Sequence, residues 1–153
     1  MGYAFVDPVA EPARIVECGL VPATGRSNAE RMRAIALALD ALIARHRPTA
    51  VAVERLFFNR NAKTAMAVAE ARGVALLCAA RAGLEVSEYT PQEVKLSVTG
   101  SGAADKKQVQ RMIALLLRLE RPIAQDNVAD AVAIALTHAQ RGRFQAAVAA
   151  ADR

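Results

Sequence analysis

The sequence predicts one α/β domain in which helices flank a mixed sheet, and three observations support this fold class. The 153 residues are 54% hydrophobic, so they can form one sizeable core but not two comfortable domains. Short runs with the alternation of strands are separated by longer runs with the period of helices. Gly and Pro residues punctuate these runs. We expect the domain to span residues 1–141, followed by an Ala-rich tail or frayed helix at 142–153.

The first half of the chain predicts a hairpin, a helix and a buried strand. Two short apolar runs on either side of a Pro-containing turn favour the hairpin. Ser27 with Glu30 three residues later has the pattern of a capping box, and it predicts the start of the helix, which ends before Pro48. The predicted elements are strands at 2–6 and 14–20, a helix at 27–46 and a buried strand at 50–54.

The second half predicts helices separated by one more strand. Gly83 ends a long Ala-rich helix, and the strand after it stops at Thr90-Pro91. A Gly-rich loop at 98–102 follows, and Pro122 closes the next amphipathic helix. The predicted elements are a helix at 61–82, a strand at 84–89, and helices at 106–119 and 126–141.

The composition favours a cytoplasmic protein with a polyanionic partner. Twenty Lys and Arg against fifteen Asp and Glu give a net charge of +5, which suits nucleic acid. Cys18 and Cys78 have neither metal-ligand spacing nor a disulfide framework, so we interpret both as reduced core thiols. The sequence has no apolar run of about 18 residues, and we expect no membrane segment.

Glu54 ends the predicted strand 50–54 and precedes the adjacent aromatics Phe57 and Phe58. A strand end fixes the backbone while the side chain meets the rim of the sheet, which suits an acid that holds a metal ion. The alternative is a solvated or capping acid. Because neighbouring strand residues point to opposite faces, we expect one of the two aromatics to be packed and the other, Phe57, to be exposed.

A second group of acids opens the last helix. Asp126 and Asp130 are four residues apart and Asn127 and Asp130 three apart, so either pair can point the same way. Capping and the helix dipole explain Asp126 well. They explain Asp130 less well, because it lies one turn further in. The spacing leaves open which pair acts together.

Three blocks resemble RuvC-type Holliday-junction resolvases. Residues 51–61 (VAVERLFFNRN), continued by Glu70-Ala71-Arg72-Gly73-Val74, resemble the strand-to-helix junction of that family. Residues 89–95 and 99–109 resemble its basic loop, and residues 126–135 its last catalytic helix. The blocks have the right order and spacing and cover nearly the whole chain.

The resemblance implies a ribonuclease H-like fold, a homodimer, and metal-dependent cleavage of four-way DNA junctions in recombination and repair, with two Mg²⁺ or Mn²⁺ ions per complete site. It implies that Glu54, Asn127 and Asp130 stand at the second, third and fourth metal-holding positions. Asn127 departs from the usual acid, since its carbonyl oxygen can bind a hard cation but brings no charge. Asp126 beside it is the alternative ligand.

The resemblance also implies a DNA-binding surface. Phe57 matches a base-stacking aromatic, and Lys95 and Lys106 match basic positions near the scissile phosphate. Lys107 and Arg60 could extend that basic patch. A branch-migration complex of RuvA and RuvB is a further partner that the resemblance suggests.

The first metal-holding position has no counterpart, because Gly2-Tyr3 matches the segment that follows it in the family. We therefore expect the family's central first strand and its aspartate to lie outside this chain, as in an N-terminally truncated gene model or a distorted domain. The expected gap between the neighbouring strands is roughly 9.6 Å, and we expect little or no cleavage. The alternatives are a non-catalytic protein of the same fold that binds DNA junctions, and a basic α/β protein that binds another polyanion.

Overall fold

The computed structural model describes residues 1–55 and 62–151, and they divide into two compact units. The first unit contains Met1 and residues 20–88, and the second contains residues 2–19 and those from Tyr89 onward. The strands of the described residues pair as two two-stranded sheets, β1 with β2 and β3 with β4. The elements are β1 (Gly2–Asp7), β2 (Arg14–Leu20), α1 (Asn28–His46), β3 (Ala50–Glu54), α2 (Ala62–Arg81), β4 (Glu85–Tyr89), α3 (Pro91–Thr99), α4 (Lys106–Leu116) and α5 (Asp126–Ala151).

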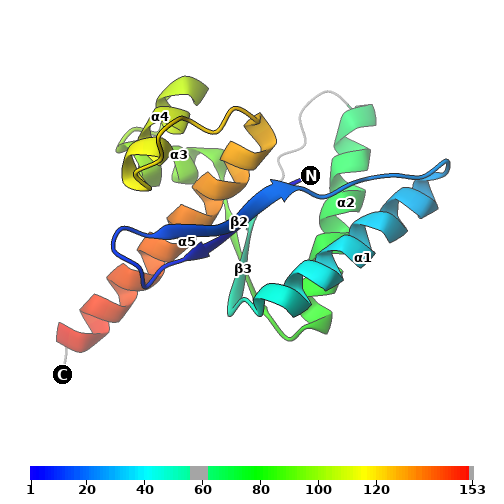
Figure 1. Ribbon diagram of the computed structural model, residues 1–153, viewed down its shortest axis with the longest axis horizontal. Coiled ribbons are helices and arrows are strands. Elements are labelled where there is room, and N and C mark those ends of the chain that lie inside the picture. The colour runs from blue at the N-terminus through cyan, green and yellow to red at the C-terminus, as the bar shows by residue number, and fades with distance from the viewer. Residues whose placement is uncertain (56–61, 152–153) are drawn as a thin grey trace. The chain divides into compact units, whose positions relative to one another are not determined.

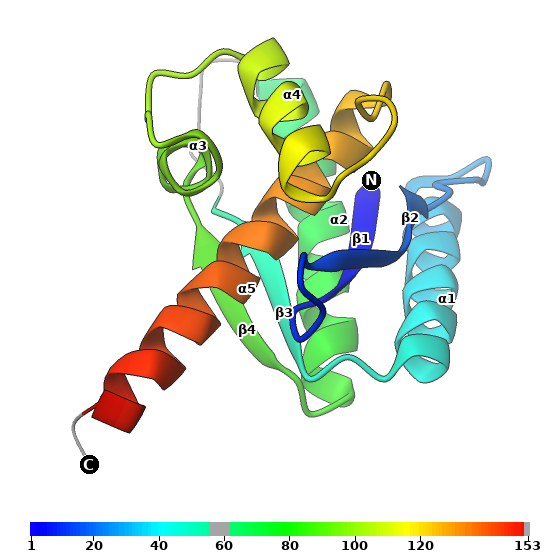
Figure 2. The same ribbon diagram turned by 60° about the vertical axis from the view of Figure 1, so that its left-hand side comes forward.

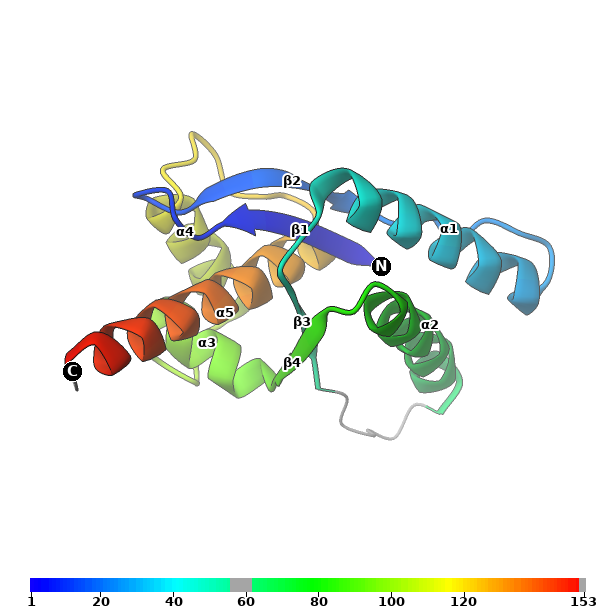
Figure 3. The ribbon, with the colours of Figure 1, turned by 90° about the horizontal axis from the view of Figure 1, so that it is seen from below.

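In the first unit, α1 and α2 pack side by side (Figure 1). The predicted capping box starts α1, because Ser27 Oγ accepts from the Glu30 N–H at 3.1 Å and the Glu30 carboxylate accepts from the Ser27 N–H at 3.3 Å. Ile35 and Cys78 are buried in this unit. The strand β3, which lies beside β4 (Figure 3), is only half-buried. The prediction of a buried strand was therefore wrong, since β3 has one partner strand in a two-stranded sheet.

In the second unit, β1 and β2 form the predicted hairpin, and β1 packs along α5 (Figure 2). The Tyr3 hydroxyl on β1 donates to Glu17 Oε1 on β2 at 2.6 Å. Apolar residues of α5, with Val132 at the centre, are buried. This burial explains why the apolar run after Asp130 forms one continuous helix.

The main differences from the sequence prediction are one additional helix and two helix ends. Helix α3 was not predicted, although Thr90 and Glu93 form a capping box and Pro91 occupies the first turn. Helix α4 ends at Leu116 rather than at 119, because Arg118 adopts a left-handed conformation with φ of 51°. Helix α5 continues through Gly142 to Ala151, as the high helix propensity of alanine favours.

The longest helix of the described residues is α5, with 26 residues. Neither α5 nor any other helix within residues 1–55 and 62–151 is both long and apolar enough to cross a membrane.

Candidate metal centre and DNA-contacting residues

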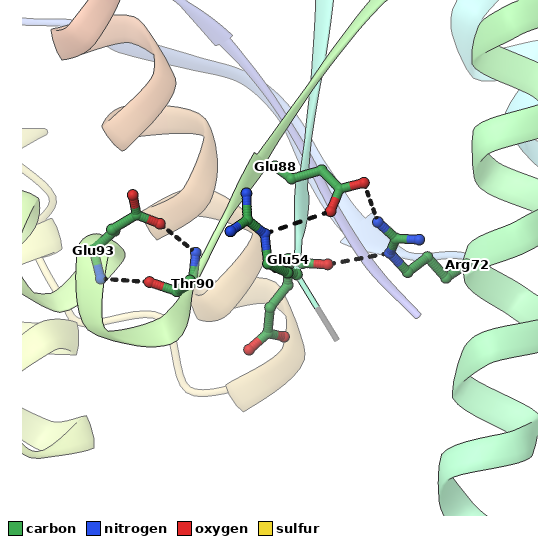
Figure 4. A network of polar contacts seen from close by, with 6 residues as sticks. Glu54, Arg72, Glu88, Thr90 and Glu93 are labelled. Carbon is green, nitrogen blue, oxygen red and sulfur yellow. Dashed lines mark hydrogen bonds and ion pairs between the residues drawn. The ribbon is translucent and has the colours of Figure 1, made fainter. Parts of the chain in front are cut away.

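Glu54 is the exposed last residue of β3, and a network of charged side chains surrounds its main chain (Figure 4). Arg72 Nε on α2 donates to the Glu54 carbonyl oxygen at 3.2 Å. The Arg72 guanidinium also forms an ion pair with Glu88 Oε1 on β4 at 2.6 Å. Arg55 Nε lies 3.8 Å from the other oxygen of Glu88. Figure 4 shows the Glu54 carboxylate pointing away from this network, so the network holds the backbone and leaves the carboxylate on the other side.

The acids at the start of α5 meet one lysine of α4. Lys106 Nζ lies 3.1 Å from Asp126 Oδ2 and 3.7 Å from Asp130 Oδ2. The Gln110 amide also donates to Asp126 Oδ1 at 3.1 Å. Asp126 therefore contacts α4 through both of its carboxylate oxygens. Neither the interpretation of Asp126 as a helix cap nor that as a metal ligand predicted these contacts. Asp126 and Asp130 act together on one cation, as their spacing of four residues allowed.

Lys106 stays charged in this arrangement. The hydrogen bond to Asp126, with the charges of both carboxylates, raises the pKa of Lys106 above its usual value of 10.5. All three side chains are about half exposed, so solvent weakens the pairs. The lysine thus neutralises part of the negative charge that a divalent cation would use.

The main chain of Asn127 is fixed by a close approach of β1. A Cβ atom placed on Gly2 would lie 1.9 Å from the Asn127 carbonyl oxygen. Only glycine fits there, because any side chain would overlap this oxygen. The start of β1 therefore packs directly against the first turn of α5 within the second unit.

The lysines occupy an electrostatically unfavourable position. Lys106 and Lys107 are the first two residues of α4, at the positive end of the helix dipole. A cation there typically costs about 0.3–1 kcal/mol, which the Asp105 cap and the pairs with the α5 acids offset. Lys95 is half-buried on α3. Charges such as those of Lys106 and Lys107, which oppose the local preference of a helix, are typical of functional sites.

The structure thus brings Asp126, Asn127, Asp130 and Lys106 together in the second unit, while Glu54 is described within the first. Phe57 and Arg60 lie outside the described residues. Within residues 1–55 and 62–151, no group of three or more His, Cys, Asp or Glu side chains is arranged to hold a metal ion.

Three residues beside these acids had no predicted role, namely Arg72, Glu88 and Gln110. For Arg72 a signal existed, because it lies in the block Glu70-Ala71-Arg72-Gly73 that carries part of the family resemblance. For Glu88 and Gln110 no local pattern pointed to a role, since their partners are distant in sequence.

An α/β fold with exposed acids at a strand end and a helix start, beside lysines, has the groups of a metal-dependent nuclease. Carboxylate and amide oxygens suit hard divalent cations, and ammonium groups suit the phosphates of DNA. The family model for crossover junction endodeoxyribonuclease RuvC matches residues 1–138. The chain belongs to the RuvC family, whose members are metal-dependent endonucleases of DNA crossover junctions.

Relatives and solved structures agree with this assignment. The RuvC protein of Alkaliphilus metalliredigens is 46% identical over 146 residues, which cover 95% of this chain and 89% of that protein. The RuvC protein of Moorella thermoacetica is 49% identical over 141 residues, covering 91% and 84%. The structure of Thermus thermophilus RuvC in complex with a Holliday junction substrate matches with a TM-score of 0.83 and 34% identity, over 95% of this chain and 96% of that chain. The predicted ribonuclease H-like fold class is confirmed.

Proposed function

We propose that this protein resolves four-way DNA junctions by metal-dependent hydrolysis of phosphodiester bonds in recombination and repair. The observation that carries the proposal is the family match over residues 1–138. Similarity over 95% of the chain to a RuvC structure with a Holliday junction substrate supports the choice of DNA substrate. The chemistry of the acids and lysines described above suits this substrate.

We propose Mg²⁺ or Mn²⁺ as the cofactor, with two ions per complete site. When bound, such ions activate a water molecule for attack and stabilise the leaving 3′ oxygen. The ligands proposed from this chain are Glu54, Asp130 and Asn127, with Asp126 as the alternative to Asn127. Their oxygen atoms are the donors that these cations take.

Asn127 is the better candidate for the third ligand in the arrangement described. Asp126 already contacts Lys106 Nζ and the Gln110 amide through its two oxygens, and metal binding would have to break these contacts. Asn127 keeps its main chain against Gly2, so its position does not depend on them. The cost is a site with one negative charge fewer.

We propose that phosphate contacts come from Lys95, Lys106, Lys107 and Arg60, and that Phe57 stacks on a base at the crossover. Lys106 holds Asp126 and Asp130 in the absence of DNA, and its ammonium can turn to a phosphate oxygen when the junction binds. The three lysines come from α3 and the start of α4, on either side of the Gly-rich loop.

We propose a cytoplasmic homodimer that works with a branch-migration complex of RuvA and RuvB. A four-way junction needs two opposed cuts, which a two-fold dimer can make symmetrically. Helix α2 supports this proposal with exposed apolar side chains at Met66 and Leu77, which are eleven residues apart and so lie on one face that a partner helix could cover.

The test compares binding of a synthetic four-way junction with binding of a linear duplex of the same sequence. We expect tighter binding of the junction, and Phe57→Ala should weaken that preference by about 1–3 kcal/mol, the usual value of one base stack. The matched control Phe144→Ala replaces an exposed aromatic near the end of α5 and should change nothing. Equal affinity for junction and duplex would contradict the proposal.

The neutral Asn127 favours one second candidate, a protein of the same fold that binds junctions without cutting them. Nicking of both opposed strands in Mg²⁺ or Mn²⁺ supports the nuclease and contradicts the expectation of little or no cleavage. Selective junction binding with no nicking in either metal supports the non-catalytic alternative.

A further inference from the structure

We propose that Arg72 is a positioning residue for Glu54, which holds the end of β3 in the geometry that metal binding requires. The inference rests on the proposed role of Glu54 as a metal ligand. Arg72 does not itself bind metal or DNA in this account. It acts through the main chain of Glu54 and through Glu88.

The Arg72 guanidinium reaches two groups at once (Figure 4). Its Nε donates to the Glu54 carbonyl oxygen at 3.2 Å, and its terminal nitrogen lies 2.6 Å from Glu88 Oε1. Only 22% of the Arg72 side chain is exposed, against 37% for Glu88. A planar guanidinium with two directed contacts has a defined orientation, which the single point charge of a lysine would not provide.

The end of β3 needs such a support, because the strand stops at Glu54. Before Glu54 the chain is held by the ladder with β4, but Arg55 lies outside the strand. The hydrogen bond from Arg72 fixes the peptide group that follows Glu54. Glu88 lies 3.8 Å from Arg55 Nε and so holds the next residue as well. The direction of the Glu54 side chain follows from a backbone held on both sides.

The charge of Arg72 and its proposed positioning role predict opposite changes in divalent-cation affinity when Arg72 is replaced. The guanidinium is a cation that contacts the main chain of Glu54, whose carboxylate is proposed to bind a divalent cation. Losing its charge alone would tighten cation binding, because it removes a repulsion. Losing the support of the backbone would weaken binding, since residues that orient metal ligands typically contribute about 10- to 100-fold to affinity. The sign of the change therefore distinguishes the two effects.

The experiment measures Mn²⁺ binding by the full chain, from the electron paramagnetic resonance signal of free Mn²⁺. Arg72→Met should weaken binding by about tenfold. The matched control is Arg81→Met, on the same helix, whose guanidinium pairs with Asp40 at 3.4 Å and which should leave Mn²⁺ binding unchanged. Arg72→Lys keeps the charge but not the two directed contacts, so it should also weaken Mn²⁺ binding, which a change in charge cannot explain. Arg72→Lys also tests the inference if Arg72→Met does not fold.

A second pair of variants shows whether Arg72 acts through Glu54. In a Glu54→Gln background, Arg72→Met should cause no further loss of Mn²⁺ affinity. Equal losses in both backgrounds would overturn the inference, as would Mn²⁺ binding by Arg72→Met that matches or exceeds wild type. If Glu54→Gln alone leaves Mn²⁺ binding unchanged, the proposed role of Glu54 falls, and this inference falls with it.

Discussion

Replacing Lys106 with methionine should tighten the binding of a divalent cation and weaken the binding of DNA. The methionine keeps much of the side-chain length and removes the ammonium group that lies 3.1 Å from Asp126 and 3.7 Å from Asp130. A metal ion at Asp130 must displace this ammonium in the wild type. The variant also lacks the ammonium group that is proposed to contact a DNA phosphate, so it should bind DNA more weakly.

The size of the effect follows from the two ion pairs. At 3.1 and 3.7 Å, unit charges in water attract by ~1.3 and ~1.1 kcal/mol. Side-chain entropy and screening reduce exposed pairs to about 0.2–1 kcal/mol each. Of these two pairs, only the one with the proposed ligand Asp130 competes with the metal ion, and about 0.2–1 kcal/mol corresponds to cation binding that is roughly 1.4- to 5-fold tighter in Lys106→Met. In a plot of the logarithm of junction affinity against the logarithm of salt concentration, the slope of Lys106→Met should be shallower by the amount that one lost phosphate contact produces.

The raised pKa of Lys106 adds a dependence on pH. A lysine whose pKa is higher in the folded state contributes stability below the unfolded value, and this contribution is lost as the pH rises through the folded value. The difference in stability between wild type and Lys106→Met should therefore be constant at neutral pH and disappear above the usual value of 10.5.

The assay combines Mn²⁺ titration with junction binding at several salt concentrations. Lys107→Met is the matched control, since it removes the same charge one residue further along α4. It should weaken junction binding with little change in Mn²⁺ affinity. The reasoning is refuted if Lys106→Met binds Mn²⁺ more weakly than wild type, or if both variants change Mn²⁺ affinity equally.

Three further predictions concern other parts of the chain. Gly2→Ala should lower the unfolding temperature, because the new Cβ would overlap the Asn127 carbonyl oxygen. We expect a loss of about 1–3 kcal/mol or more in the free energy of unfolding. An unchanged unfolding temperature would contradict the close approach of Gly2 to Asn127. Asn127→Asp should tighten Mn²⁺ binding by about tenfold through its added charge, and no change would argue against Asn127 as a ligand. Burial raises the pKa of both Cys18 and Cys78, so iodoacetamide should react slowly with either at neutral pH, and with the 1% exposed Cys78 only on unfolding; rapid labelling of native Cys78 would refute its burial.

The fold could be predicted where a local signal acts alone. Ser27 and Glu30 define the start of α1 within four residues, and the structure confirms both hydrogen bonds. The same signal at Thr90 and Glu93 was overlooked, because Pro91 was interpreted only as the end of a strand. Proline also favours the first turn of a helix, and there it begins α3.

The candidate site could be predicted only in part. The spacing allows Asp126 and Asp130, or Asn127 and Asp130, to point the same way, and in the structure Lys106 pairs with both aspartates. Lys106 was predicted only as a phosphate contact, and its pairing with these acids could not be predicted, because it depends on how α4 packs against α5. For the same reason, no local pattern shows that Arg72 supports Glu54, or that β1 meets the start of α5.

The most direct test of the account is Mn²⁺ binding by Glu54→Gln and Asp130→Asn, which remove one charge each and keep the side-chain shape. Each variant should bind Mn²⁺ at least about tenfold more weakly than wild type. The control Glu85→Gln changes an exposed acid of β4 and should bind as wild type does. Wild-type affinity in both Glu54→Gln and Asp130→Asn would contradict the proposed metal centre.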